Sequence, residues 1–342
     1  MIKLGIIGAG RMGITHYSII NSHPDIEIVA VADPSSVTTS LMEKYLKIQT
    51  FKDYKKMFQK VELDAVLVCT PPFLNVTILE EAARLGLHVF CEKPFTLTAK
   101  DASALVQSFE AKRLVNQVGY VNRFNDVFTT VKDLIDKEII GKVIRFRTEM
   151  FSRTVVDPEE GSGWRSSHEQ GGGVVFEMAT HSIDLVNYIL GKPDKVIGSS
   201  LTKVFSKNVE DIVSTTLVYK SGLIGSMYVN WSDESYRKPT NKIELFGSKG
   251  KILADQHGLK IFLKVSLPAY NLREGWNSMN ITDVFKPVPF YVRGNEFTSQ
   301  LYHFVDCITD STLKNSCSFR DGADTLDVIE RIFNDFELNG KF

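Results

Sequence analysis

The chain has 342 residues, of which 43% are hydrophobic and 24% charged, with a formal net charge of −1 at pH 7. This length predicts about two domains, because one hydrophobic core seldom grows beyond about 250 to 300 residues. The near-neutral charge offers no field that attracts nucleic acid or an anionic membrane, and no apolar stretch approaches the ~20 residues needed to span a bilayer. We therefore expect a globular, cytoplasmic protein whose partners are small molecules, with no nucleic-acid or membrane partner.

The N-terminal residues carry a glycine pattern that is typical of dinucleotide binding. Gly8 permits a tight turn after an apolar run, Gly10 lets the backbone approach a pyrophosphate, and Gly13 lets the following helix pack on the strand. Asp33 ends the second apolar run, where the fingerprint expects an acid for the ribose hydroxyls. The residues assigned to this site are Gly8, Gly10, Arg11, Met12, Gly13 and Asp33.

Apolar runs alternate with helical patterns along the first part of the chain, which indicates βαβ units and a doubly wound parallel sheet. A helix from Ala99 to Lys112 has Thr98 as its N-cap, with Asp101 in the capping-box position. The expected strands are Leu4–Ile7, Ile28–Ala32, Ala65–Cys69, His88–Cys91 and Leu114–Val118.

The pattern changes after Phe124. A helix ending near Gly141 is followed by an alternating strand at 143–151 with one polar face, and later strand-like runs are joined by short turns, which predicts an open, mostly antiparallel sheet. A long irregular stretch, Ser152–Gly173, indicates a functional loop. We expect an α/β protein with a dinucleotide-binding Rossmann domain at 1–122 and a substrate-binding and oligomerisation domain at 123–342. The further strands are expected at Val196–Val204, Ile212–Tyr219, Leu223–Trp231, Lys242–Phe246, Lys251–Ala254 and Leu259–Leu263, and the closing helices at Asn295–Thr309 and Asp321–Leu338.

Hydride transfer from an alcohol needs a base and a group that stabilises charge on oxygen. His181 is the candidate base, because it follows a glycine run and shares a helix face with Glu177 and Asp184; the alternative is a histidine buried at a helix start. Lys93 follows an apolar strand, at the sheet edge where open α/β folds bind ligands. The turn at Thr70-Pro71 follows a neighbouring strand and is either part of that edge or an ordinary strand-ending turn.

A metal site is not expected. Glu177, His181 and His168 could be imagined as ligands, but their spacing is not HExxH and no cysteine lies near them in the sequence.

Together these motifs resemble the Gfo/Idh/MocA oxidoreductases, a family that includes glucose-fructose oxidoreductase and inositol dehydrogenase. The resemblance covers nearly the whole chain and rests on Gly8-x-Gly10-x-x-Gly13, Thr70-Pro71, Glu92-Lys93-Pro94, Gly119-Tyr120-x-x-Arg123-Phe124, Trp164-Arg165, the run from Gly171 and His181-x-x-Asp184. It implies a homodimer or homotetramer built through the open sheet. It also implies that the Lys93–Pro94 peptide is cis.

The resemblance further implies roles for single residues. Lys93 would hydrogen-bond the reacting hydroxyl, His181 would act as acid and base with Glu177, and Asp184 would contact substrate or fix His181. The implied cofactor contacts also include Thr70, Pro71, Asn75, Glu92, Lys93, Trp164 and Arg165. The implied substrate contacts are Lys93, Tyr120, Arg123, Trp164, Arg165, His181 and Asp184.

Two positions depart from the family pattern: Glu177 stands where Asp is frequent, and Asn75 where His is frequent. The longer Glu177 side chain predicts a shifted substrate pose. Asp33, with no arginine in Pro34-Ser35-Ser36, favours NAD over NADP, although the serines and the helix start could still accommodate a phosphate.

The expected function is an NAD(P)-dependent oxidoreductase that interconverts a secondary alcohol and a ketone on a sugar, cyclitol or sugar derivative. The alternatives are a dehydrogenase or reductase of a cyclic non-sugar substrate, similar to dihydrodiol dehydrogenase, and a non-catalytic cofactor-binding regulatory protein.

Overall fold

The computed structural model describes residues 1–157 and 163–339, so residues 158–162 of the expected irregular stretch lie outside it. The chain forms two compact units: Met1–Val121 with Pro287–Ala323, and Asn122–Lys286 with Asp324–Phe342. The expected domains are continuous in sequence, whereas the first unit has a second segment. This segment packs there because helix α9 (Asn295–Thr309) buries an apolar face in the core of the first unit, through Leu301, Phe304 and Val305.

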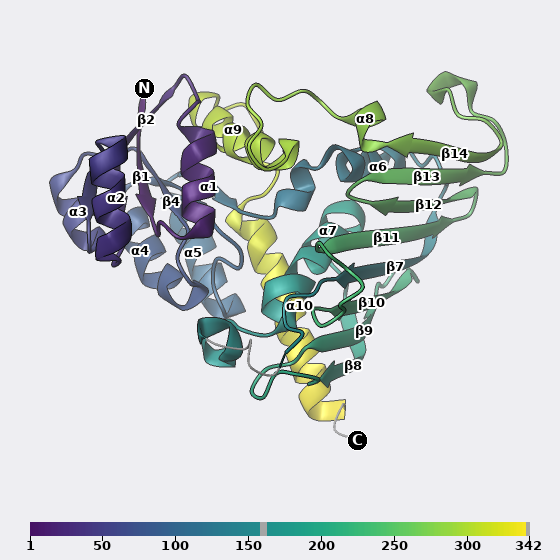
Figure 1. Cartoon of the computed structure of the whole chain (residues 1–342). Helices are drawn as coiled ribbons and strands as arrows, with labels where there is room; N and C mark the ends of the chain where they lie inside the picture. Colours follow the sequence, from purple (N-terminus) through teal and green to yellow (C-terminus); the bar gives the residue numbers. More distant parts are fainter. Residues whose placement is uncertain (158–162, 340–342) are drawn as a thin grey trace. The chain divides into compact units, whose positions relative to one another are not determined.

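The first unit contains, over the described residues, a parallel six-stranded sheet in the order β3-β2-β1-β4-β5-β6 (Figure 1). The expected parallel sheet is thus present, with one further short strand, β3. The strands are β1 (Ile2–Ile7), β2 (Ile26–Ala32), β3 (Gln49–Phe51), β4 (Ala65–Val68), β5 (His88–Cys91) and β6 (Asn116–Val118). The helices between them are α1 (Arg11–Ile20), α2 (Ser36–Leu46), α3 (Tyr54–Lys60), α4 (Asn75–Leu85) and α5 (Ala99–Ala111).

Local signals and long-range burial agree in this unit. The Thr98 side chain accepts a hydrogen bond from the backbone N–H of Asp101 at 3.0 Å, so the predicted N-cap of α5 is confirmed. Strand β4 is buried on both faces, as a central parallel strand covered by helices must be. The carboxyl ends of β1, β4 and β5 therefore meet at one edge of the sheet, where the turns after them lie together.

The second unit contains, within the described ranges, an eight-stranded sheet in the order β14-β13-β12-β11-β7-β10-β9-β8 (Figure 1). All neighbouring strands are antiparallel except β7 and β10, so the sheet is mostly antiparallel as expected. The strands are β7 (Val143–Phe151), β8 (Lys195–Thr202), β9 (Ile212–Val218), β10 (Ile224–Asn230), β11 (Thr240–Gly247), β12 (Gly250–Asp255), β13 (Gly258–Leu263) and β14 (Gly275–Asn280). The helices are α6 (Asp126–Asp136), α7 (Thr180–Leu190), α8 (Ile281–Val284) and α10 (Phe319–Asn339), of which α10 begins in the first unit.

The two faces of this sheet differ in burial. On β7, Phe146, Thr148 and Met150 are buried, while Arg147 and Glu149 alternate with them on the other face. Helices α6 and α7 contact the sheet, and α10 continues into the same unit. The face that carries Arg147 is open, and the Arg147 side chain is 57% exposed.

Within the described residues, no helix combines the length and the apolar character that crossing a bilayer requires.

Candidate active site

The glycine turn between β1 and α1 has three different local environments. Gly8 has φ +89°, a left-handed conformation that favours glycine, and a Cβ there would lie 2.7 Å from the carbonyl oxygen of Cys69. A Cβ on Gly13 would collide with the carbonyl oxygen of Gly8, so α1 packs here only because Gly13 has no side chain. Gly10 differs, because a Cβ there meets nothing within 4 Å. The backbone at Gly10 thus faces open space at the N-terminus of α1, where an anion can approach.

Asp33 is held beside this turn by backbone donors. Its Oδ2 accepts a hydrogen bond from the N–H of Ala9 at 2.7 Å, and its Oδ1 accepts one from the N–H of Ser35 at 2.8 Å. Each carboxylate oxygen keeps a further lone pair that could accept a ribose hydroxyl. The open backbone at Gly10 and the oriented acid fit a dinucleotide. Arg11 and Met12 occupy the first turn of α1.

Asn75 connects the turns after β4 and β5. It accepts a hydrogen bond from the Thr70 hydroxyl at 2.7 Å, and its Nδ2 donates to the carbonyl oxygen of Pro94 at 3.3 Å. Asn75 is 1% exposed and holds the two turns together, and its predicted contact with the cofactor stays a prediction. Pro71 precedes the short helical turn Pro72–Leu74 that leads into α4.

Lys93 lies directly after β5, at the same sheet edge as the glycine turn, and its peptide bond to Pro94 is cis, as the resemblance implied. The carboxylate of Glu92 accepts a hydrogen bond from the backbone N–H of Lys93 at 3.2 Å and contacts Nε2 of His16 at 2.6 Å. Sequence reasoning missed His16, although its position one turn after Gly13 on the same predicted helix could have placed it near the site.

In the second unit, Arg123 and Asp184 form a buried ion pair. Arg123 Nε donates to both carboxylate oxygens at 3.0 Å, and Nη2 donates to Oδ1 at 2.8 Å. Arg123 is 5% exposed and Asp184 is fully buried. The ion pair holds α7 to the turn of Arg123, and the predicted substrate contacts of both residues stay predictions. Tyr120, in the first unit, is also fully buried.

Trp164, Arg165 and Glu177 form a second cluster in this unit. The Arg165 guanidinium lies 4.5 Å from the ring centroid of Trp164, and its Nε lies 3.6 Å from Oε2 of Glu177. Arg165 is exposed, and Trp164 and Glu177 are partly exposed, so this cluster can reach a ligand.

The helix that carries His181 begins irregularly. Val175–Ala179 is a π-helical turn, and α7 starts only at Thr180, so the α-helical spacing assumed for Glu177 and His181 does not apply. Such turns are frequent at functional sites. Asp184 does lie one α-helical turn after His181, as expected.

Glu210 was not predicted from the sequence. Its Oε1 accepts a hydrogen bond from the backbone N–H of Val175 at 3.0 Å, and its carbonyl oxygen accepts one from Val174 at 3.0 Å. Burial raises the pKa of Glu210 to about 7. Glu210 thus anchors the chain just before Glu177. Gly173, with φ +100°, leaves the room that the Glu210 carboxylate occupies.

His168 packs among aromatic rings, with centroids 4.7 Å from Phe333 and 5.7 Å from Phe176, and burial lowers its pKa. Among residues 1–157 and 163–339, no three His, Cys, Asp or Glu side chains come together as metal ligands.

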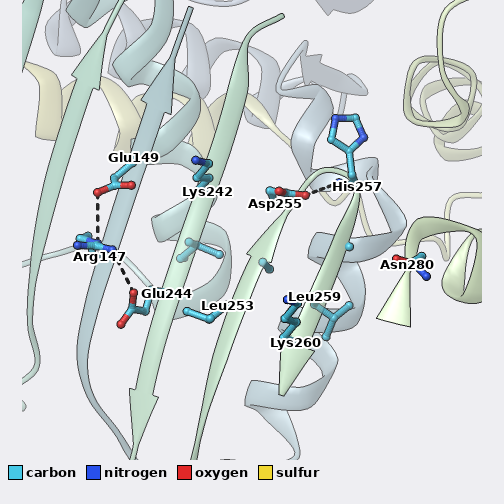
Figure 2. Close-up of a pocket in the computed structure, with 13 residues that line it drawn as sticks. Arg147, Glu149, Lys242, Glu244, Leu253, Asp255, His257, Leu259, Lys260 and Asn280 are labelled. Atoms are coloured by element: carbon cyan, nitrogen blue, oxygen red, sulfur yellow. Dashed lines mark hydrogen bonds and ion pairs between the residues drawn. The ribbon is translucent and has the colours of Figure 1, made fainter. Parts of the chain in front are cut away.

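A hollow of about 440 Å³ lies on the open face of the second sheet and not at these residues. Figure 2 shows its charged lining, with Arg147 between Glu149 and Glu244. Lys242, Asp255 and Lys260 lie on neighbouring strands, and His257 lies in the turn between β12 and β13.

Comparison with known proteins agrees with this architecture. A myo-inositol 2-dehydrogenase from Thermotoga maritima is 26% identical over 326 residues, covering 93% of this chain and 87% of that protein. A 2,7-anhydro-N-acetylneuraminate hydratase from Escherichia coli is 26% identical over 260 residues, covering 75% and 68%. The crystal structure of a levoglucosan dehydrogenase in complex with NADH and levoglucosan superposes with a TM-score of 0.86 at 20% identity, covering 98% and 97%.

Two sequence models of one oxidoreductase family account for most of the chain. Residues 2–120 match its NAD-binding Rossmann domain, and residues 128–253 match its C-terminal domain. The chain therefore belongs to the Gfo/Idh/MocA family of oxidoreductases and carries that family's NAD-binding Rossmann domain.

Proposed function

We propose that the protein is an NAD-dependent oxidoreductase that interconverts a secondary alcohol and a ketone on a sugar, cyclitol or sugar derivative. The observation that carries this proposal lies within the first unit. The dinucleotide turn after β1 and Lys93 after β5 share the carboxyl edge of one parallel sheet, which is the ligand-binding edge of such folds. The inositol and levoglucosan dehydrogenases that the chain resembles support the substrate class.

Bound NAD would supply the carbon that accepts the hydride. The residues of this chain do the rest. In the first unit, the Lys93 ammonium donates a hydrogen bond to a substrate oxygen and stabilises negative charge there. In the second unit, the His181 imidazole acts as base during oxidation and as acid during reduction. Glu177, beside Arg165, binds and orients the substrate next to His181.

The roles of Lys93 and His181 are tested by measuring NADH absorbance during incubation of NAD⁺ with a panel of polyols, aldoses and nucleotide sugars. Lys93→Ala and His181→Ala should each lower kcat about 100-fold or more while NADH affinity stays within about twofold. Lys100→Ala, an exposed lysine on α5, is the matched control and should behave as wild type. Full turnover in either alanine variant removes that residue from the mechanism.

The NAD preference rests on Asp33, whose charge would repel a 2′-phosphate. Asp33→Asn should shrink the preference for NADH over NADPH about tenfold or more in a fluorescence titration. Asp25→Asn, the same change at an exposed position of the same unit, should leave the ratio unchanged. NADPH binding that is already tighter in the wild type overturns the assignment.

The hydratase among the relatives supports a second candidate, addition of water to an anhydro sugar, which opens its ether bridge with no net redox change. Mass spectrometry of the products separates the two functions: a gain of water without net NADH formation favours the hydratase.

We further propose a cytoplasmic homo-oligomer, a dimer or tetramer that associates through the open sheet face. Phe262 and Trp276 are exposed on that face, on the two strands that carry the lining residues Lys260 and Asn280 of the hollow.

A further inference from the structure

His16 is a buried histidine close to Lys93. It lies on α1, one turn after Gly13, and is fully buried, with its ring 5.2 Å from that of Phe90 in an edge-to-face contact. Its Nε2 lies 2.6 Å from Oε1 of Glu92, while its Nδ1 has no hydrogen-bond partner within the described part of the chain.

This asymmetry indicates where the proton lies on the ring. An ionised carboxylate oxygen accepts hydrogen bonds and donates none, so the 2.6 Å contact between Nε2 and Glu92 is favourable only when Nε2 carries the proton. The arrangement with the lower cost has the proton on Nε2, which donates to the Glu92 carboxylate, and a bare lone pair on Nδ1. His16 thus donates one hydrogen bond, which orients the Glu92 carboxylate.

The same carboxylate holds the backbone of Lys93. Glu92 Oε2 accepts the N–H of Lys93 at 3.2 Å. Gly119 limits the carboxylate from another direction, since a Cβ on Gly119 would lie 2.9 Å from Oε2. The position of the Glu92 carboxylate is therefore set by His16 and by the absence of a side chain at Gly119.

A second support acts on the other end of the same turn. Asn75 donates to the carbonyl oxygen of Pro94, the residue after Lys93, and Asn75 is itself fixed by Thr70. The backbone is thus held both before and after the Lys93 side chain, and only the first support includes an ionisable pair.

We propose that His16 is a positioning residue for Lys93, acting through the Glu92 carboxylate and the backbone N–H of Lys93. The inference rests on the proposed function insofar as Lys93 acts in catalysis. His16 lies on α1, the helix that follows the dinucleotide turn, and acts on Lys93 without contacting the reacting atoms.

The experiment compares three substitutions. His16→Leu removes the donor, His16→Gln places an amide N–H near the former Nε2, and Gly119→Ala displaces the carboxylate from the opposite side. His23→Leu is the matched control, because His23 is also buried in the first unit but contacts Tyr302, away from Lys93.

The first readout does not depend on any substrate. Brief labelling with acetic anhydride across a pH series, followed by peptide mass spectrometry, measures the reactivity of the Lys93 amine, with Lys100 as internal reference. We expect His16→Leu and Gly119→Ala to change the Lys93 labelling rate at least fivefold, with His16→Gln and His23→Leu near wild type. With an active substrate, His16→Leu should lower kcat at least tenfold with little change in KM or NADH affinity, and His16→Gln should restore most of it.

Unchanged Lys93 labelling in both His16→Leu and Gly119→Ala overturns the positioning role, whatever the activity. Changed labelling in a protein that turns over no substrate supports the positioning role and contradicts the proposed function instead. Thermal unfolding identifies a variant that does not fold, and Gly119→Ala then carries the test.

Discussion

Asp184 and Glu210 are buried carboxyl groups of the second unit with opposite environments. Asp184 faces the guanidinium of Arg123 through both oxygens. Glu210 faces the backbone N–H of Val175, with Lys203 and Asp211 as the nearby charged groups. One carboxyl group is matched by a cation, and the other keeps its proton to near-neutral pH.

Removing one partner of the Arg123–Asp184 pair leaves the other charge buried and unpaired. We expect Asp184→Leu or Arg123→Leu to lower the free energy of unfolding by about 3 to 5 kcal/mol, and the double variant to lose less than the sum. The exposed pair Lys132–Asp136 on α6 is the control, and Asp136→Leu should cost under about 1 kcal/mol. Urea unfolding measures all four; additive losses would show that the pair is not coupled.

Glu210 predicts a pH dependence of stability. Its pKa is about 7 in the folded protein against an ordinary 4.5, so between these values the folded state holds a proton that the unfolded state has lost. The contribution of Glu210 to stability therefore falls as pH rises from about 4.5 to 7, by about 3 kcal/mol in all.

Glu210→Gln should remove this fall. The difference in free energy of unfolding between pH 5 and pH 8 should therefore be smaller in the variant than in the wild type. Glu234→Gln, an exposed carboxyl group, is the control and should leave the profile unchanged. Denaturation at the two pH values gives the answer, and identical profiles for wild type and Glu210→Gln would exclude the raised pKa.

At the scale of the element, the turn from β1 into α1 separates two roles of glycine. Gly10 has φ −72°, which alanine adopts, and free space for a Cβ, whereas Gly13 has the Gly8 carbonyl oxygen in that space. Gly10 therefore leaves open space at the start of α1, whereas Gly13 permits close packing.

Gly10→Ala should change the free energy of unfolding by less than about 0.5 kcal/mol but weaken NADH binding about tenfold or more, because the methyl group enters the path of the pyrophosphate. Gly13→Ala should destabilise the fold by about 1 to 3 kcal/mol through overpacking. Thermal melts with and without NADH distinguish the two, and a reversed pattern would contradict the assignment.

The observed helices and strands show which sequence signals were sufficient to predict secondary structure. Period-two alternation and turn residues placed β7, β9 and β10 close to their observed bounds. The short strands β3 and β14 were missed, because Gln49–Phe51 has only three residues and Gly275–Asn280 has few apolar ones. The π-helical turn before α7 was also missed, since residue spacing does not distinguish it from an α-helix.

At the scale of the whole molecule, the open face of the second sheet combines exposed aromatic rings with paired charges. Phe246, Phe262 and Trp276 are 49%, 36% and 48% exposed on strands that also carry the lining of the hollow in Figure 2. Such a face is costly to leave in water and suits a second copy of the chain.

Phe262→Asp with Trp276→Asp should shift the sedimentation coefficient from an oligomer to a monomer. Leu41→Asp, at a residue 51% exposed on α2, is the matched control and should leave the assembly intact. A wild-type monomer at all concentrations would refute association through this face.

Local periodicity and short motifs in the chain were enough to predict one group of features. Each of these features depends on residues that are close in sequence or lie in one βαβ unit. They are the alternating strands and helices, the glycine turn with Asp33, the Thr98 cap, and Lys93 at the end of a strand. Which polar groups contact one another is visible only in the folded chain. His16 and Glu92 are 76 residues apart, and Arg123 and Asp184 are 61 apart. Strand order and helix packing bring such distant residues together. Once buried, each polar group needs the other as its hydrogen-bond partner.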